Sequence, residues 1–543
     1  MSNGVYRILN PKNEKMLGYL PGSEERQGLK ARLAELREAA VEIPMIIGGR
    51  EVRSGRVGRC IIPHDHARVL ATYHMAGEAE VRMAVQSALD AGRAWAETPW
   101  DHRLAVFLRA AELISGPWRH TLNAATMLGQ SKTVCEAEAD AACELTDFFR
   151  FNSYFLRQIL EEQPESVQGI LNRMEYRPLE GFVFAVTPFN FTAIGGNLPG
   201  APAVAGNTVV WKPASTAVFS NYYVMKVLEA AGLPDGVINF IPGPGSEVGP
   251  AVLAHPMLAG VHFTGSTAVF QEMWRTVAGN LDGYNGYPRL VGETGGKDFA
   301  FVHPSAEVDA LIPALVAGAF SYQGQKCSAT SRVYLPESLW PGVRPRLLEA
   351  VAGIRMGDPA DFTHYMGAVI DRPAFEKIYG CLRFVRESDK AEIVAGGECD
   401  DAGGFFIRPT VIATQDPGFR TMREEIFGPV LTVFVYPDGD LEKALGLCAA
   451  TSRYALTGAV FARDRAAIVA MERRLRHSAG NLYINDKTTG ALVGCQPFGG
   501  SRMSGTNDKA GSRLNLLRWL SPRAIKENFN PPRDYRFGLM REA

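Results

Sequence analysis

Short apolar runs alternate with amphipathic stretches from about residue 180 onward, and this alternation restricts the fold more than any other feature of the chain. Such alternation is typical of βαβ units that build a parallel sheet. A second block of the same kind spans about 298–485. The sequence therefore predicts an α/β protein with two parallel-sheet domains. The expected strands are 182–186, 208–211, 237–241, 260–264, 289–292, 298–302, 331–335, 392–395, 430–435 and 457–461.

The flanking regions carry other patterns. Residues 23–40 place three leucines on one face of a predicted helix, and similar periodicity predicts that the first third of the chain is mostly helical. The helix prediction includes 134–155, whose phenylalanines are interpreted as core residues. Residues 163–180 are interpreted as a strand pair that protrudes from the body. Trp519–Ala543 is expected to form an extended tail that needs a surface to lie on.

The composition is that of an ordinary globular chain of several domains, with 543 residues of which 46% are hydrophobic and 21% charged. A net charge of -1 gives no support to nucleic-acid binding. The N-terminus lacks the features of a presequence, and no window approaches the ~18 apolar residues of a membrane span. We therefore expect a soluble, cytoplasmic protein of bacterial type, or one of the mitochondrial matrix if the chain is a mature eukaryotic form.

The cysteine pattern favours free thiols. The eight cysteines lie far apart and form no CxxC pair, which is typical of a reducing compartment. His64-Asp65-His66 is the only local cluster that resembles a metal site, and without further spaced ligands it is interpreted as a polar loop. No metal is predicted.

One cysteine stands in a different context. Cys327 follows a glycine-bearing turn and precedes small, hydroxyl-bearing residues, in the segment Tyr322 to Thr330. A nucleophilic thiolate needs a reachable sulfur and a lowered pKa, and this open, polar context with Lys326 beside the thiol meets that need. The alternative is a buried structural cysteine, which is the more common state of a free thiol.

Polar residues and glycines follow four of the expected strands. Ligands of parallel α/β sheets gather beyond the carboxyl ends of the strands, so these loops are candidate binding segments. They are Thr187-Pro188-Phe189-Asn190-Phe191, Lys212-Pro213, Thr264-Gly265-Ser266 and Glu293-Thr294-Gly295-Gly296-Lys297.

Taken together, these segments resemble the aldehyde dehydrogenase superfamily. They occur in the order of that family and span most of the chain. The matching elements are Pro188 to Phe191, Trp211-Lys212-Pro213, Phe263 to Ser266, Glu293 with Gly295-Gly296-Lys297, Gly324 to Cys327, and Glu424 to Pro429.

A narrower resemblance is to the Δ1-pyrroline-5-carboxylate dehydrogenases, also called L-glutamate-γ-semialdehyde dehydrogenases, in their monofunctional form. It extends over nearly the full length. It is carried by Phe191 to Asn197, Gly324 to Thr330, Tyr483 to Lys487, Gln496 to Gly500 and Ser504 to Lys509.

The resemblance implies an oxidoreductase of proline catabolism with a cysteine nucleophile. Cys327 would attack the aldehyde of L-glutamate γ-semialdehyde, and the Asn190 amide with the Cys327 backbone N–H would stabilise the oxyanion. Hydride transfer to NAD would leave a thioester, which water activated by Glu293 would hydrolyse to L-glutamate. Asn190 as a helix cap and Glu293 as an ion-pair partner are the structural alternatives.

The resemblance also implies the cofactor residues. Lys212 would contact the adenosine ribose, Gly265 and Ser266 the pyrophosphate, and Glu425 with Phe427 the nicotinamide side, while Thr187, Pro188 and Phe189 would line the same cleft. Two departures from the family pattern matter. Ser215 stands where many relatives have a ribose-binding glutamate, which predicts that NAD is preferred and NADP tolerated. Phe270 stands where glycine is frequent.

The substrate residues are implied in the same way. Gly490 and Ala491 would anchor the α-carboxylate through backbone amides, Ser328 would add a hydroxyl and Lys326 a charge. Phe191 and Phe498 would sandwich the aliphatic chain, and as single residues they are equally consistent with core aromatics. Glu144 would steer the ammonium group or pair with Lys326.

The resemblance implies a domain division and partners. A Rossmann-like NAD-binding domain would comprise 1–162 and 181–294, the catalytic domain 295–500, and an oligomerisation element 163–180 and 501–543. A lone protruding ribbon is marginal in water, which favours a homodimer or higher homo-oligomer. A proline dehydrogenase is a further partner that the resemblance suggests. Competing functions are oxidation of another semialdehyde such as that of succinate, a non-catalytic structural relative, and a thiol esterase.

Overall fold

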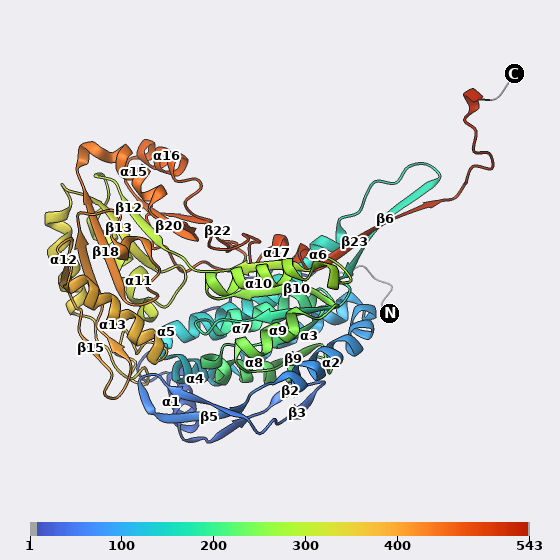
Figure 1. Cartoon of the computed structure of the whole chain (residues 1–543), viewed down its shortest axis with the longest axis horizontal. Coiled ribbons are helices and arrows are strands. Elements are labelled where there is room, and N and C mark those ends of the chain that lie inside the picture. The colour runs from blue at the N-terminus through green and yellow to red at the C-terminus, as the bar shows by residue number, and fades with distance from the viewer. Residues whose placement is uncertain (1–7, 541–543) are drawn as a thin grey trace.

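Within residues 8–540, which the computed structural model describes, the chain forms two lobes, each built on a seven-stranded sheet (Figure 1). The first sheet has the order β11-β10-β7-β8-β9-β2-β3. Its five strands from β11 to β9 are parallel, and β2 and β3 add an antiparallel edge. The strands are β11 Arg289–Glu293, β10 Leu258–Thr264, β7 Phe182–Val186, β8 Thr208–Lys212, β9 Ile238–Phe240, β2 Met45–Ile47 and β3 Arg50–Val52.

Both faces of the first sheet are buried. Alternate side chains of a strand point to opposite faces, so each strand contributes to two apolar clusters. On β7, Val183 and Ala185 join one apolar cluster while Phe182 and Phe184 join another. Helices supply the other side of each cluster. They include α2 Glu78–Glu97, α7 Thr192–Val204, α8 Val218–Ala230, α9 Gly245–Leu253 and α10 Thr267–Gly279, with α1 Glu24–Glu38, α3 Trp100–Ser115, α4 Arg119–Gln130, α5 Val134–Ala137 and α6 Leu145–Glu161 beyond.

The second sheet has the order β14-β17-β18-β13-β12-β20-β21 and is parallel except for the edge strand β14. Phe299 and Phe301 face one cluster and Ala300 and Val302 the other. The strands are β14 Ala391–Ala395, β17 Thr410–Thr414, β18 Val430–Tyr436, β13 Thr330–Pro336, β12 Asp298–Val302, β20 Thr457–Phe461 and β21 Asn481–Ile484. The main helices are α11 Val308–Phe320, α12 Trp340–Ala352, α13 Arg372–Arg386, α15 Leu441–Ala450 and α16 Arg465–Arg474.

Three expectations need correction. The first third is not helical throughout, because residues 41–74 hold β1 Val41–Ile43, β4 Val57–Ile62 and β5 Asp65–His74 as well as β2 and β3. The expected helix over 134–155 contains a π-helical segment, Glu138–Glu144, between α5 and α6. Neither sheet is parallel throughout, because one edge of each is antiparallel: β2 and β3 in the first sheet and β14 in the second.

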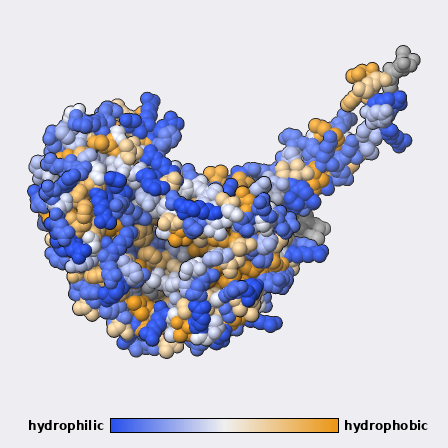
Figure 2. Space-filling model, in the orientation of Figure 1, coloured by the Kyte–Doolittle hydropathy of each residue, from blue (hydrophilic) through white to orange (hydrophobic). Residues whose placement is uncertain are grey.

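The protruding element also differs from the expected strand pair. Only one strand, β6 Ile170–Pro178, comes from 163–180, and its antiparallel partner is β23 Leu520–Asn528 from the C-terminal segment. The ribbon and the chain beyond it stand clear of the body (Figure 2). Trp519, expected to begin the tail, is instead fully buried.

Candidate active site

Cys327 follows a turn with left-handed backbone. The φ angles are 50°, 56° and 64° at Tyr322, Gln323 and Gly324. Glycine is required at the last position, since a Cβ there would lie 2.3 Å from the carbonyl oxygen of Gly428. The turn leads into β13 and leaves Cys327 half-buried, so its sulfur is reachable as predicted.

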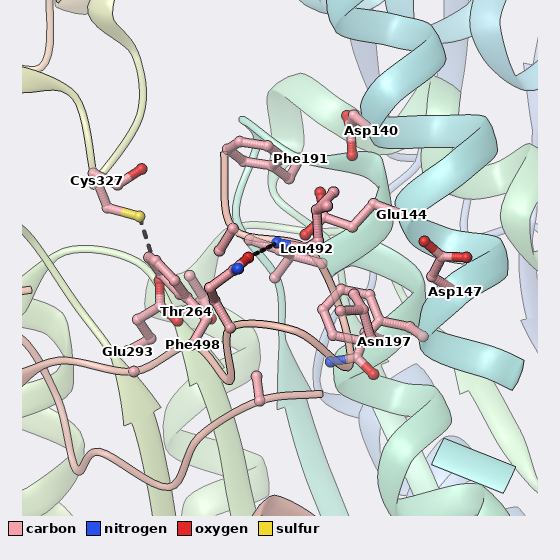
Figure 3. A pocket seen from close by; sticks show the side chains of 18 of the residues that line it. Asp140, Glu144, Asp147, Phe191, Asn197, Thr264, Glu293, Cys327, Leu492 and Phe498 are labelled. Atoms are coloured by element: carbon pink, nitrogen blue, oxygen red, sulfur yellow. Dashed lines mark hydrogen bonds between the residues drawn. The ribbon is translucent and has the colours of Figure 1, made fainter. Parts of the chain in front are cut away.

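The Cys327 thiol meets the carboxyl group of Glu293, which ends β11. Its S–H donates to Glu293 Oε1 at 3.3 Å (Figure 3). Burial raises the pKa of Glu293 to about 7, although the Cys327 hydrogen bond and Lys509 act to lower it. Burial and the adjacent Glu293 carboxylate hold the pKa of the Cys327 thiol well above its ordinary value. The expectation of a lowered thiol pKa is therefore wrong for this arrangement, in which the carboxyl group is placed to take the thiol proton.

Asn190 lies just after β7 and is buried. Its side-chain amide donates to the carbonyl oxygen of Gln325 at 3.1 Å, which ties the strand exit to the turn that carries Cys327. An amide nitrogen has two N–H groups, so this bond leaves one for a ligand. Asn190 is held against the Cys327 segment and does not cap a helix.

A single pocket of about 230 Å³ joins the residues predicted for substrate binding (Figure 3). Cys327 and Glu293 also line it. It includes Phe191, Lys326, Ser328, Gly490, Ala491 and Phe498. Because these residues come from both lobes and from the segment after β21, the pocket lies where the two lobes meet.

The loop that contains Gly490 and Ala491 is fixed at its start by hydroxyl groups. Ser328 Oγ donates to Thr489 Oγ1 at 2.9 Å, and Thr488 Oγ1 donates to the Ser328 carbonyl at 2.7 Å. Gly490 has a φ of 97°. Within the part of the chain that the structure describes, the N–H groups of Gly490 and Ala491 donate to no protein acceptor. The pocket therefore offers two backbone donors to a ligand.

Lys326 does not pair with Glu144. Its ammonium group lies 2.9 Å from Glu136 Oε2 and 3.1 Å from Ser321 Oγ, so Glu136 balances its charge. Glu144 lines the pocket, and burial, followed by the nearby carboxylate of Asp140, raises its pKa to about 8. The expectation of a Lys326–Glu144 pair is wrong, and Glu136 was missed because 190 positions separate it from Lys326.

Lys132 and Asp140 form a fully buried ion pair beside the site that sequence analysis did not find. The ammonium group lies 2.7 Å from Asp140 Oδ2 and 4.1 Å from the centre of the Phe191 ring. Asp140 also accepts hydrogen bonds from the backbone N–H groups of Thr192 and Ala193, at the start of α7. The π-helical segment sets the direction of Asp140, and no motif in the sequence indicates such a segment.

The cofactor residues at the ends of β8 and β10 fit an anionic dinucleotide. Lys212 is buried, its pKa is lowered to about 8 by burial, and no carboxylate of residues 8–540 pairs with it. Ser215 begins the short helical turn after β8. Ser266 caps the N-terminus of α10, and Gly265 N–H donates to the Glu293 carbonyl at 3.2 Å. A buried, unpaired lysine and a helix N-terminus are groups that bind phosphate and ribose.

The remaining cofactor residues lie between this region and Cys327. Thr187 Oγ1 accepts a hydrogen bond from Trp211 Nε1. Pro188 follows Thr187 in the sequence, and the ring of the next residue, Phe189, lies 5.8 Å from that of Phe427. Glu425 Oε1 accepts the Gly296 N–H at 2.9 Å. Glu425 shares one hollow with Ser266 and another with Phe427 and Cys327. The structure thus brings Ser266 and Phe189 of the first lobe next to Glu425 and Phe427 of the second.

Residues 8–540 contain neither a metal-binding cluster nor a helix that could span a membrane. No cluster of three or more histidine, cysteine, aspartate or glutamate residues in 8–540 could hold a metal ion. Over the same residues, none of the helices has the length and apolar character needed to cross a membrane.

Comparison with known proteins identifies the class. Residues 52–525 match the model of the aldehyde dehydrogenase family, and the chain belongs to that family. The fold agrees with this assignment, because two mostly parallel sheets build the two lobes and the thiol lies where the lobes meet.

The individual relatives carry narrower names than the family. The chain is 50% identical over 536 residues to the mitochondrial Δ1-pyrroline-5-carboxylate dehydrogenase of Dictyostelium discoideum, covering 98% of this chain and 96% of that one. The NAD-bound Δ1-pyrroline-5-carboxylate dehydrogenase of Mycobacterium tuberculosis superposes with a TM-score of 0.96 at 51% identity, with full coverage of both chains. Proline utilization A of Bdellovibrio bacteriovorus superposes with a TM-score of 0.91 at 31% identity, and 96% of this chain covers 53% of that chain.

Proposed function

We propose that this protein is an NAD-dependent dehydrogenase that oxidises L-glutamate γ-semialdehyde, in equilibrium with Δ1-pyrroline-5-carboxylate, to L-glutamate in proline catabolism. One observation carries the proposal. A single pocket contains a thiol hydrogen-bonded to a carboxyl group, and it is also lined by Gly490 and Ala491, whose backbone N–H groups have no acceptor among the described residues. The names of the relatives support the same reaction.

The residues act in a defined order. Glu293 accepts the thiol proton across the 3.3 Å contact, and the Cys327 sulfur attacks the aldehyde carbon to give a tetrahedral adduct. The Cys327 N–H and the second N–H of Asn190 stabilise its oxyanion. Bound NAD supplies the hydride acceptor. Once Glu293 has released the thiol proton to solvent, its carboxylate deprotonates the water that hydrolyses the resulting thioester.

Cofactor binding would use both lobes. Lys212 binds the adenosine ribose, Gly265 and Ser266 face the pyrophosphate, and Glu425 holds the nicotinamide ribose. Thr187, Pro188, Phe189 and Phe427 line the nicotinamide side, and Ser215 leaves room for the additional phosphate of NADP. The unpaired charge of buried Lys212 supports this assignment.

Substrate binding would divide the pocket by polarity. Gly490 and Ala491 take the α-carboxylate, with Ser328 beside them, and Phe191 and Phe498 hold the aliphatic chain. Glu144 faces the α-ammonium group, since a buried carboxyl group with a raised pKa gains from a cation brought next to it. Lys326 contributes less charge than expected, because Glu136 balances it.

The domain division and assembly are part of the proposal. Residues 1–162 and 181–294 form the NAD-binding domain, 295–500 the catalytic domain, and 163–180 with 501–543 the oligomerisation element. The tail beyond β23 exposes large apolar side chains that a second subunit would cover. They are Phe529, Tyr535, Phe537, Leu539 and Met540. We place the enzyme in the cytoplasm or, in a eukaryote, in the mitochondrial matrix. The match to about half of proline utilization A supports a proline dehydrogenase as functional partner.

The test is an NADH assay with two aldehydes. Wild-type protein is expected to reduce NAD with glutamate semialdehyde, and Cys327→Ala to lose that activity by at least about 1000-fold. Ala491→Asp is expected to raise KM for glutamate semialdehyde about 10-fold or more, because a carboxylate beside the anchoring amides repels that of the substrate. Its kcat with propanal should change little.

A substrate panel separates the competing readings. Faster turnover of succinate semialdehyde than of glutamate semialdehyde would favour another semialdehyde dehydrogenase. Binding of NAD without NADH formation from any aldehyde would indicate a non-catalytic relative. Hydrolysis of an activated ester without NAD reduction would point to the esterase.

A further inference from the structure

The N-terminal strap, defined here as residues 13–17, forms part of the wall of the proposed substrate pocket. Three of its residues, Asn13, Glu14 and Met16, line the pocket together with the loop that follows Thr489. This segment lies outside every helix and strand, so its position depends on the side chains that hold it.

Ion pairs and backbone contacts fix the strap to the first lobe. Glu14 pairs with Arg119 at 2.9 Å and with Arg150 at 2.7 Å. Its backbone N–H donates to Asp147 Oδ1 at 2.7 Å, and the N–H of Leu17 donates to Glu138 Oε1 at 2.7 Å. The strap is therefore a fixed support for whatever packs on it.

Asn13 joins this support to the substrate loop, and both N–H groups and the oxygen of its side-chain amide make hydrogen bonds. One N–H donates to Asp147 Oδ2 at 2.8 Å and the other to the carbonyl oxygen of Val493 at 2.8 Å. Its Oδ1 accepts the S–H of Cys495 at 3.6 Å. Val493 lies two residues after Ala491, so the strap holds the end of the loop while hydroxyl contacts at Thr488 and Thr489 hold its start.

The fit of the loop on α6 makes this tie important. Gly494 has a φ of 81°, and a Cβ there would lie 2.1 Å from the Phe151 ring. The loop therefore approaches α6 as closely as its backbone allows. A small shift of the loop would turn the N–H groups of Gly490 and Ala491 away from the pocket, and hydrogen bonds weaken steeply with such misalignment.

We propose that Asn13 is a positioning residue that sets the specificity of this enzyme for aldehydes carrying an α-carboxylate, by holding the 490–495 loop from the N-terminal strap. The proposal rests on the proposed function for the substrate and adds a residue that does not itself contact the reacting atoms. Its selective effect follows from the geometry, because the tie holds the anchoring loop and touches neither Cys327 nor Glu293.

The test compares Asn13→Ala and the isosteric Asn13→Asp, which removes both N–H donors, with the exposed neighbour variant Lys12→Ala as control. Each Asn13 variant is expected to raise KM for glutamate semialdehyde about 5- to 10-fold, as the loss of one or two hydrogen bonds predicts. Its kcat, and both constants with propanal, should stay within about twofold. Lys12→Ala should match wild type.

A second readout does not depend on the substrate. Alkylation of Cys495 by iodoacetamide, followed by peptide mass spectrometry, should be several-fold faster in Asn13→Ala than in wild type and Lys12→Ala, because the thiol loses its acceptor and the loop its tie. Asn13→Asp keeps an acceptor oxygen for the thiol, so this readout uses Asn13→Ala alone. Unfolding temperatures report whether each variant is folded.

The outcomes are distinguishable. Equal KM changes for both aldehydes would overturn the positioning role. So would an unchanged KM in the folded Asn13 variants together with unchanged Cys495 labelling in Asn13→Ala. If Ala491→Asp raised KM selectively and the Asn13 variants did not, the proposed function would stand and this inference would fail. If Ala491→Asp had no selective effect, the anchoring loop itself would have been assigned wrongly.

Discussion

At the scale of residues, the site depends on one proton shared between Cys327 and Glu293. The two groups are 3.3 Å apart in a buried region, where burial raises the pKa of both and the Glu293 carboxylate raises that of the thiol further, while the thiol hydrogen bond acts to lower that of Glu293. The thiol is therefore protonated in this arrangement, and the carboxylate is the group that can remove its proton. Reactivity resides in the pair and not in the cysteine alone.

The pH dependence of activity should report this pair. Glu293 works as a base only when ionised, so kcat/KM for a neutral aldehyde should fall about 10-fold per pH unit as the pH drops below about 7, the raised pKa of this carboxyl. Glu293→Gln should lower kcat about 100-fold or more and remove that inflection. A rate that stays level as the pH falls well below 7 would contradict the assignment.

The residues of the site differ in how far sequence predicts them. Glu293 and Asn190 stand in motifs at strand exits and Cys327 in the motif that precedes β13, and the structure places all three where the lobes meet. The charge balance of Lys326 was not predictable, because Glu136 reaches it from α5 through the fold. Asn13 was missed for the same reason, since it contacts Val493 across nearly the whole length of the sequence.

At the scale of elements, most predicted binding residues lie where strands end, and the features that the sequence did not predict lie in irregular elements. The expected strands agree closely with the structure, because their apolar runs reflect burial on both sheet faces. The π-helical segment and the pairing of β6 with β23 have no such periodic signal, since they depend on contacts far apart in the chain.

The exit of β8 yields a prediction about the cofactor. With Ser215 in place, we expect NAD to be preferred and NADP to be used measurably. Ser215→Glu should lower kcat/KM for NADP about 10-fold or more, because its carboxylate would repel the additional phosphate. The value for NAD should change by no more than about twofold. Steady-state kinetics with both cofactors check this, and a wild-type enzyme that rejects NADP completely would contradict it.

At the scale of the whole molecule, the β6–β23 ribbon and its tail extend away from the two lobes (Figure 1). A two-stranded ribbon is marginally stable alone, and the tail carries large side chains such as Phe537, which is 68% exposed. This geometry favours a covering surface, which in our proposal is a second copy of the chain related by twofold symmetry.

Sedimentation velocity tests the assembly. The full chain is expected to sediment as a dimer or larger species at micromolar concentration, and a chain ending at Asn528 should shift toward smaller species. Single substitutions of exposed charged residues on the opposite side, such as Arg344→Ala, serve as controls. A full-length protein that is monomeric at these concentrations would refute the oligomer.

The central claim is that Cys327 forms the covalent intermediate with glutamate semialdehyde. Wild-type protein, in which Glu293 is present to take the thiol proton, is mixed with glutamate semialdehyde and NAD and quenched with acid during the first turnover, when the intermediate should be populated. Mass spectrometry of the quenched protein should find the mass of a glutamyl group, as a thioester, on the peptide that contains Cys327. An unmodified Cys327, or the added mass on another cysteine, would contradict the account.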